Sequence, residues 1–377
     1  MFASESSAAD FALPALQLRA LARRAAVPAL LTIAAVAGVL LLQSHVHVLA
    51  DCIRRVLHAN PGWALVALVL ECLSLAGYVA LLWLVAGRAA PTVRARESAQ
   101  ITFAGAAATR LLPTAGAGGL ALALWALRQA GLRPRAATRT LLTFLVLLYS
   151  VFLTAIVLSG AVLALGLVGS QGPRELSAVA AIAAALGILL CVMLATRRPR
   201  PNAQENADFA RRGPRARVAA GSRLIGDAVR EAVSLLRSGD ARLAGAVAYW
   251  ALDAAVLWAM LHAFGSAPAL PVVVLAYFVG QVANTLPLPG SVSGGIAGVL
   301  IAFGVSSGVA LPAVLAYRAV AVWLPTPAAI AAIPALRATV ARWRRETGCA
   351  RPARSAAESM PAHERFGSLE PVAVAVS

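Results

Sequence analysis

The sequence predicts an all-α polytopic membrane protein with about six spans and two re-entrant broken-helix hairpins arranged as an inverted repeat. Of 377 residues, 60% are hydrophobic and only 13% are charged, whereas soluble domains carry about 25% charged residues. Long apolar runs alternate with short arginine-bearing segments. Two apolar runs are interrupted by prolines and glycines, in the stretches TRLLPTAGAGGL (109–120) and VANTLPLPGSVSGGI (282–296).

Neither interruption can continue a helix, because proline removes a backbone donor and glycine adds an entropic cost. At bilayer depth, broken backbone is tolerated only where protein or a wet cavity surrounds it. We therefore expect each interruption to form the tip of a hairpin. The expected tip residues are Pro113, Gly116, Gly118, Gly119, Pro287, Pro289, Gly290, Gly294 and Gly295. Two interpretations of the glycines remain open. Either they leave backbone N–H groups facing an anion at the start of the next helix, or they allow helices to pack closely.

The first half of the chain begins with a short polar tail, residues 1–26, and a first span over 27–43 that is near the lower length limit for crossing a bilayer. Apolar residues at helical spacing in 45–60 predict a helix lying along the interface. Three further elements follow in order: a span over 62–87, the first hairpin over 99–130, and a span over 140–168.

The second half starts with a span over 176–196. Residues 197–242 form a polar, basic loop with a helical piece near 217–236, expected to face water and lipid headgroups. A span over 243–265, the second hairpin over 271–305 and a span over 310–334 complete a membrane domain of residues 27–336. The tail, 337–377, begins basic and then becomes an Ala/Pro/Ser/Glu segment for which we expect disorder.

Arginine counting predicts the topology. The chain has no lysine, and 28 of its 33 basic residues fall on one face if both hairpins return to the side they entered. The positive-inside rule makes that face cytoplasmic, with both termini there. The net charge of +17 is thereby explained without nucleic acid, which we do not expect as a partner. The four cysteines show no CxxC pairing, so no metal site is expected.

The two units of span, hairpin and span, 62–168 and 243–334, are related. Residues 131–144 align with 304–317 without gaps. Three crossings lie between the starts of the two units, and this odd number makes them oppositely oriented. Such inverted repeats are characteristic of secondary transporters, whose broken helices meet near the midplane.

The motif NTLPLPGSVSGG (284–295), followed by IAFGV and AVLAYRAVAVWLP (313–325), is similar to a signature of the lysylphosphatidylglycerol synthase transmembrane region, a flippase-like family of bacterial membrane proteins. The Tyr317–Arg318 pair lies in the most specific part. The resemblance implies a two-hairpin inverted repeat that moves or binds a lipid with a large polar headgroup. This chain departs from the family at Ala115 and Ala117, where an arginine and a glutamate are common. The segment after the last span is too short for the family's aminoacyl transferase domain, so we expect no synthase activity.

Four charged residues fall at bilayer depth, where each costs about 2.5–3.5 kcal/mol and should be partnered or face water. They are Glu71, Arg110, Asp253 and Arg318. One interpretation is that they form ion pairs that fix the bundle. The other is that the arginines bind a lipid phosphate and the carboxylates neutralise them when the site is empty. Asn284 and Gln281 could also donate to a headgroup, or satisfy freed carbonyl groups instead.

Together with the resemblance, these observations predict a flippase for an anionic phospholipid or a polyprenyl-linked lipid in a bacterial inner (plasma) membrane. The alternative is a non-transporting scaffold or lipid-binding subunit of an envelope-biosynthesis complex, which would have a protein partner. We expect no enzymatic activity and no cofactor, because the spans show no nucleophile–base pair and no metal-ligand set. The predicted substrate site comprises Arg110, Arg318, Asp253, Glu71, Asn284, Gln281 and Tyr317.

Overall fold

A computed structural model describes residues 60–111, 117–169, 172–196, 214–265, 267–283 and 290–359. These described parts are helical and contain no strand. The tail 1–26, the first span 27–43 and the interfacial segment up to residue 59 lie outside them, as do residues 197–213 of the basic loop and the end of the tail from residue 360.

The same order of helices occurs twice in the described chain: a long helix, two short helices and another long helix. In the first half these are α3 (Pro61–Ala89), α4 (Ala95–Leu111), α5 (Ala117–Gln129) and α6 (Pro134–Ala164). In the second half they are α9 (Ala244–Phe264), α10 (Leu270–Val282), α11 (Ser291–Ala302) and α12 (Ser307–Trp323). Between the halves lie α7 (Arg174–Thr196), α8 (Pro214–Arg237) and the 3-10 turn η2 (Ala241–Leu243), and α13 (Thr326–Ser359) ends the described chain.

Several helix ends follow directly from the sequence. Asn60 caps α3 by accepting a hydrogen bond from the Gly62 N–H at 2.9 Å, with Pro61 as the first helical residue. Prolines also open α6 and α10, where a missing N–H costs nothing. Gly290 has φ 78° and provides the left-handed residue before α11, a conformation that glycine adopts without steric cost.

Within the described residues, five helical segments are long and apolar enough to cross a membrane: residues 61–89, 134–164, 174–196, 241–264 and 307–346. They correspond to the five expected spans that the structure describes. The last one differs from expectation, because α12 ends at Trp323 and α13 starts anew at Thr326. Pro325 and Pro327 explain the interruption, since a proline within a helix removes a hydrogen bond and clashes with the turn before it.

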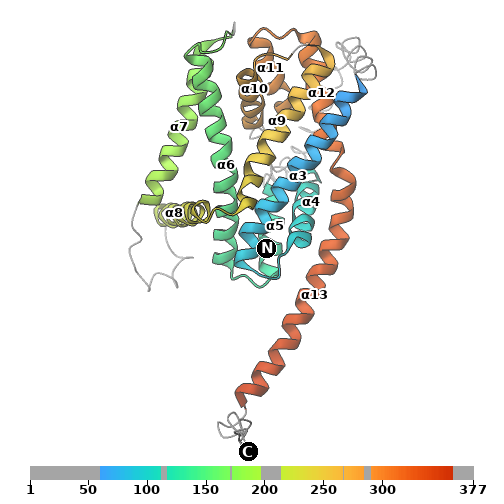
Figure 1. Cartoon of the computed structure of the whole chain (residues 1–377). Helices are drawn as coiled ribbons and strands as arrows, with labels where there is room; N and C mark the ends of the chain where they lie inside the picture. The colour runs from blue at the N-terminus through green and yellow to red at the C-terminus, as the bar shows by residue number, and fades with distance from the viewer. Residues whose placement is uncertain are drawn as a thin grey trace, which may run out of the picture. The chain divides into compact units, whose positions relative to one another are not determined.

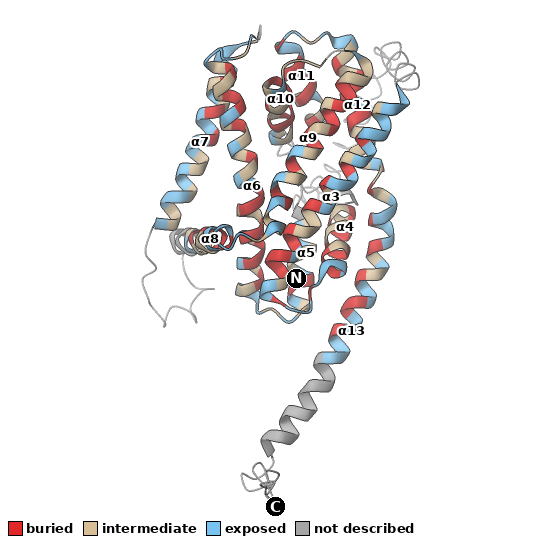
Figure 2. Cartoon of the chain, viewed as in Figure 1, coloured by how far each residue is buried: buried red, intermediate tan, exposed pale blue. Residues whose placement is uncertain are grey.

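Large apolar side chains cover the outside of these helices. Leu65, Val69 and Leu73 of α3 are at least half exposed, and Figure 2 shows exposed residues along most of α7. Contiguous apolar surface of this extent is incompatible with water but suits lipid. α7 contacts the bundle where Gly160 of α6 meets the Ser177 carbonyl and Ala181, the small-residue packing typical of membrane helices.

The predicted helical piece of the basic loop is confirmed as α8, which packs on α6 and α7. Figure 1 shows it nearly end-on, whereas α6 and α7 run along the page. Its buried residues Ala228, Val229, Ala232 and Leu235 lie at helical spacing. On its polar side, Glu231 forms a 2.9 Å ion pair with Arg139 of α6. α8 is therefore an amphipathic helix, suited to a membrane interface.

Candidate functional site

The centre of the bundle is the contact between α3 and α9, the first helices of the two halves. A Cβ atom on Gly77 would lie 2.8 Å from the Gly245 carbonyl oxygen, so the backbones touch there. One turn along, the Ser74 hydroxyl donates a 2.9 Å hydrogen bond to the Tyr249 carbonyl. At the far end, the Trp63 and Trp258 rings lie 5.6 Å apart. Residue numbers fall along α3 as they rise along α9, so the two helices are antiparallel.

This close approach brings Glu71 and Asp253 together, one from each half. Both are buried, at 4% and 7% exposure, and the Glu71 carboxyl group is a hydrogen-bonding neighbour of Asp253. No third His, Cys, Asp or Glu joins them to form a metal-binding group among the described residues. A pair of carboxyl groups at bilayer depth requires polar neighbours.

Helices α10 and α12 supply these neighbours. The Tyr277 hydroxyl donates to Asp253 Oδ2 at 2.6 Å, and the Tyr317 hydroxyl approaches the same oxygen at 3.4 Å. Gln281 Nε2 donates to the Tyr317 hydroxyl at 3.3 Å. We call Glu71, Asp253, Tyr277, Gln281 and Tyr317 the carboxyl cluster. In the described parts of the chain, Asp253 Oδ1 has no hydrogen-bond partner.

Arg318 lies beside the carboxyl cluster, next to Tyr317 on α12. Its side chain is half-buried, and its charge acts on Asp253. Among the described side chains, no ion pair within 4.0 Å joins the Arg318 guanidinium to either carboxyl group. The structure thus brings the two predicted carboxylates to each other and places Arg318 near them, without an ion pair within 4.0 Å between these described side chains.

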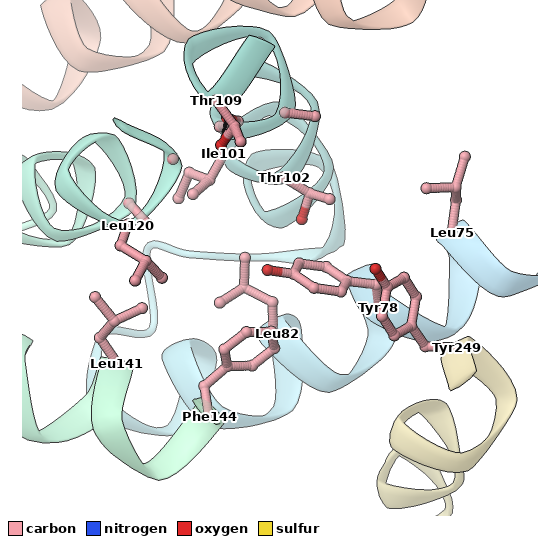
Figure 3. A pocket seen from close by; sticks show the side chains of 14 residues that line it. Leu75, Tyr78, Leu82, Ile101, Thr102, Thr109, Leu120, Leu141, Phe144 and Tyr249 are labelled. Atoms are coloured by element: carbon pink, nitrogen blue, oxygen red, sulfur yellow. Dashed lines mark hydrogen bonds between the residues drawn. The ribbon is translucent and has the colours of Figure 1, made fainter. Parts of the chain in front are cut away.

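A cavity of about 200 Å³ lies between the first pair of short helices and the bundle, and Tyr249, one turn before Asp253 on α9, is among the residues that line it (Figure 3). We call it the hairpin cavity. Leu82, Leu120 and Phe144 make most of its wall apolar, while Tyr78 and Tyr249, with ring centroids 5.0 Å apart, line one side. Both carboxyl groups of the carboxyl cluster act electrostatically on Tyr249. Tyr249 therefore links the hairpin cavity, which it lines, to the carboxyl cluster, one turn away along α9.

The predicted tip glycines that the structure describes lie at helix starts and helix contacts. Gly119 packs against Gly105 within the first pair of short helices, and Gly295 packs against Gly280 within the second. Gly118 is buried near the start of α5, and Gly294 has open space around its Cα. Pro113, Gly116, Asn284, Pro287 and Pro289 lie outside the described residues, as does the side chain of Arg110.

Sequence reasoning missed Tyr277, Tyr249 and Ser74. A signal was available, since Tyr277 precedes Gln281 by four residues and Tyr249 precedes Asp253 by four. This spacing places each tyrosine on the same helix face as a predicted site residue.

Residues 24–329 match the family described as the lysylphosphatidylglycerol synthase TM region. Comparison with proteins of curated function gives no match. The matched segment includes both sets of long and short helices and every residue of the carboxyl cluster. On this match, the chain belongs to the lysylphosphatidylglycerol synthase TM region family.

Proposed function

We propose that this protein is a flippase that moves an anionic phospholipid or a polyprenyl-linked lipid across the bacterial cytoplasmic membrane. The family is of the flippase-like kind, and the described chain contains five helical segments suited to crossing a membrane. We propose no enzymatic activity of its own and no cofactor.

The observation that carries the proposal is the antiparallel packing of α3 and α9. Because α4 follows the end of α3 and α10 follows the end of α9, the two pairs of short helices lie at opposite ends of this contact (Figure 1). α10 has 13 residues and α11 has 12, which at 1.5 Å per residue gives about 20 Å. The hydrocarbon core is about 30 Å thick. These lengths support a second hairpin that turns back within the bilayer, and the antiparallel contact supports entry of the two hairpins from opposite leaflets.

Local geometry supports the inverted repeat. Each second short helix ends in the same motif, with Leu132 N–H donating to the Leu127 carbonyl and Val305 N–H donating to the Leu300 carbonyl. A glycine with positive φ precedes each donor, Gly131 at 97° and Gly304 at 86°. These positions are equivalent in the sequence alignment of the two halves, and the motif is a known way to end a helix.

The site offers separate environments for the two parts of a lipid. Arg318 can pair with a phosphate, because a guanidinium presents several N–H donors to its oxygens. The hairpin cavity is apolar, and at about 200 Å³ it is smaller than the 300–1,000 Å³ typical of a whole ligand pocket. It therefore suits one segment of a hydrocarbon chain. Arg110, Asn284 and Gln281 remain proposed headgroup contacts.

Contacts among the arginine-bearing segments support one orientation of the helix bundle in the membrane. Arg88 of α3 lies 3.7 Å from Asp240, Arg139 of α6 pairs with α8, and Arg342 of α13 pairs with Glu97 of α4 at 3.0 Å. These arginines therefore share one end of the bundle. We propose that this end faces the cytoplasm.

The test is lipid movement in proteoliposomes, measured as reduction of a fluorescent headgroup-labelled phosphatidylglycerol by an impermeant reagent. We expect Arg318→Ala to slow movement by about 10- to 100-fold, since a hydrogen bond to a charged group contributes about 1.5–3 kcal/mol. Arg110→Ala tests the other membrane-embedded arginine in the same way. Arg237→Ala, at the exposed end of α8, is the matched control and should move lipid at the wild-type rate.

Wild-type protein that leaves the labelled lipid in its original leaflet would refute the flippase proposal. Unchanged movement in both Arg318→Ala and Arg110→Ala would remove these residues from the site.

The second candidate function, a scaffold for an envelope-biosynthesis enzyme, is favoured by α13. This helix runs from Thr326 to Ser359 and extends beyond the bundle in Figure 1, where it could contact a protein partner. Copurification of a partner that is lost on deletion of residues 347–377, together with no lipid movement by the isolated chain, would favour this role.

A further inference from the structure

A groove between α5 and α13 gathers arginines at the basic end of the bundle. Arg337, Arg344 and Arg345 line it from α13, and Trp125 lines it from α5. The three arginines are seven and eight residues apart, a spacing that places them on one face of a helix. A second hollow shares Trp125 and adds Arg128 of α5. We call these five residues the arginine groove.

The contacts of α13 fix the position of the groove. Arg344 Nε donates a 3.0 Å hydrogen bond to Gln129 Oε1 of α5, and Arg342 of α13 pairs with Glu97 of α4. Trp125 is 39% exposed, and tryptophan is enriched where membrane and water meet. In the orientation proposed above, the groove therefore lies at the level of the lipid headgroups in the cytoplasmic leaflet.

Acidic side chains at this end of the bundle are paired with arginines outside the groove. The ion pairs are Arg88–Asp240, Arg242–Asp240, Arg139–Glu231, Arg342–Glu97 and Arg342–Glu346. None of the described side chains that line the groove is acidic. In the described part of the chain, Arg128, Arg337 and Arg345 form no ion pair within 4.0 Å. These three arginines therefore carry positive charge that no described acid neutralises.

A phosphate group on a lipid suits this arrangement. Guanidinium groups present several N–H donors to phosphate oxygens, and basic pockets between membrane helices on the cytoplasmic side bind anionic headgroups. The two hollows have volumes of about 360 and 380 Å³, within the range of about 300–1,000 Å³ typical of ligand pockets. Trp125 and Val340 add apolar wall to the first hollow. This apolar surface suits the glycerol and first acyl carbons of a lipid, whereas a soluble phosphate would not use it.

We propose that the arginine groove binds the headgroup of an anionic phospholipid of the cytoplasmic leaflet. The groove shares no lining residue with the hairpin cavity and no residue with the carboxyl cluster. The inference goes beyond the flippase function, because it holds whether or not the bound lipid is the one that moves. Only the choice of leaflet rests on the orientation proposed above.

The experiment is native mass spectrometry of the full chain in detergent, titrated with phosphatidylglycerol or with phosphatidylcholine of identical acyl chains. The fractions of protein that carry lipid give the dissociation constants. We expect the wild type to bind phosphatidylglycerol at least about tenfold more tightly than phosphatidylcholine, because only the first headgroup has a net negative charge. Equal affinities for the two lipids would overturn the proposal.

The variant Arg337→Gln/Arg345→Gln removes two positive charges from exposed positions of the groove. Each basic side chain near an anionic lipid contributes about fivefold to binding, so we expect affinity for phosphatidylglycerol to fall by about 10- to 30-fold. The central site contributes equally to wild type and variant, because Arg318 and the carboxyl cluster are unchanged. Wild-type affinity in this variant would overturn the proposal.

Arg133→Gln/Arg237→Gln is the matched control, because it removes two exposed arginines outside the groove. It should bind phosphatidylglycerol as the wild type does, and an equal loss in the control would overturn the assignment to the groove. Arg128→Gln tests the α5 side independently and should lower the affinity by about fivefold. It keeps the proposal testable if the double variant does not fold, and wild-type affinity in Arg128→Gln would then overturn it.

Inorganic phosphate separates a lipid site from a site for a free anion. At millimolar concentration it should leave phosphatidylglycerol bound, and displacement of the lipid would overturn the lipid assignment. Lipid movement in proteoliposomes is a separate measurement. A protein that binds phosphatidylglycerol in the groove but moves no lipid would refute the flippase function and leave the arginine groove standing.

Discussion

At the scale of single residues, two buried carboxylates show how differently the fold can satisfy a buried acid. Glu97 accepts hydrogen bonds from the Arg94 N–H at 3.2 Å and from Arg342 at 3.0 Å, so its charge is fully matched. Asp253 has tyrosine hydroxyls on one oxygen and, among the described residues, nothing on the other. The first arrangement fixes α13 against α4, whereas the second joins α9 to α10 and α12.

Tyr277→Phe tests the strongest contact in the carboxyl cluster. The change removes the 2.6 Å hydrogen bond to Asp253 and leaves a buried carboxyl group less satisfied. We expect the free energy of unfolding in detergent to fall by about 1–2 kcal/mol. Tyr149→Phe is the control, since Tyr149 is 48% exposed and its hydroxyl can be replaced at little cost. An equal loss of unfolding free energy in the two variants would show that the hydrogen bond between Tyr277 and Asp253 does not stabilise the fold.

The carboxyl group of Asp240 predicts how the stability of the fold depends on pH. Hydrogen bonds from the Arg242 side chain and backbone lower its pKa from 3.8 to about 2, with help from the charges of Arg242 and Arg88. Because the folded-state pKa is below the unfolded value, Asp240 stabilises the fold above about pH 4, and this contribution is lost as the pH falls toward 2.

Thermal unfolding of wild type and Asp240→Asn in detergent checks this pH dependence. The difference between their unfolding temperatures should be largest at neutral pH and shrink between pH 4 and 2. A difference that stays constant over this range would show that the carboxylate charge of Asp240 does not stabilise the fold.

The sequence was sufficient to select Glu71, Asp253, Gln281, Tyr317 and Arg318, because polar residues in apolar runs are costly. It did not show that the two acids meet each other. That depends on the register between α3 and α9, which Gly77 and Gly245 set across more than 160 residues of intervening chain. Only the packing of the two halves determines it.

At the scale of helices, the contact between α3 and α9 depends on glycine. Gly77→Ala would place a Cβ atom 2.8 Å from the Gly245 carbonyl oxygen. Neither backbone can move away without disturbing the contact between α3 and α9. We expect a loss of about 1–3 kcal/mol of unfolding free energy and displacement of Glu71 from Asp253. The measurement is unfolding in mixed detergent micelles.

Gly298→Ala in α11 is the matched control, because a Cβ atom there meets no atom within 4 Å. Replacing glycine within a helix at an open position should stabilise the helix by about 0.5–1 kcal/mol. Similar changes in the free energy of unfolding at positions 77 and 298 would mean that α3 and α9 are not tightly packed against each other.

The ends of the helices show which parts of the fold can be predicted from sequence patterns. The expected spans 62–87 and 243–265 match α3 and α9 to within a few residues, because prolines, capping residues and charges mark their ends. The break between α12 and α13 was missed, since Pro325 was read as part of an apolar run. The continuation of α13 through the basic residues Arg337, Arg342 and Arg344 depends on tertiary contacts, including the 2.8 Å hydrogen bond between Thr339 and Gln100.

At the scale of the whole molecule, the proposal requires the two pairs of short helices to enter from opposite leaflets. Ser238, at the end of α8, lies 3.2 Å from Arg88 at the basic end of the bundle. Ser306 precedes α12 and lies between the second pair of short helices and that helix. The two serines should therefore face opposite compartments.

Single-cysteine labelling tests this topology in a background in which Cys52, Cys72, Cys191 and Cys349 are changed to serine. An impermeant maleimide should label Ser306→Cys in intact cells, and Ser238→Cys only after the membrane is made permeable. The positive-inside rule sets this direction, and the antiparallel α3 and α9 helices set the opposition between the sites. Labelling of both positions from the same side would exclude the inverted repeat. The first hairpin starts at the basic end near Ser238 and the second ends at Ser306, so both hairpins would then enter from one face, and a central site exposed alternately to the two leaflets would lose its structural basis.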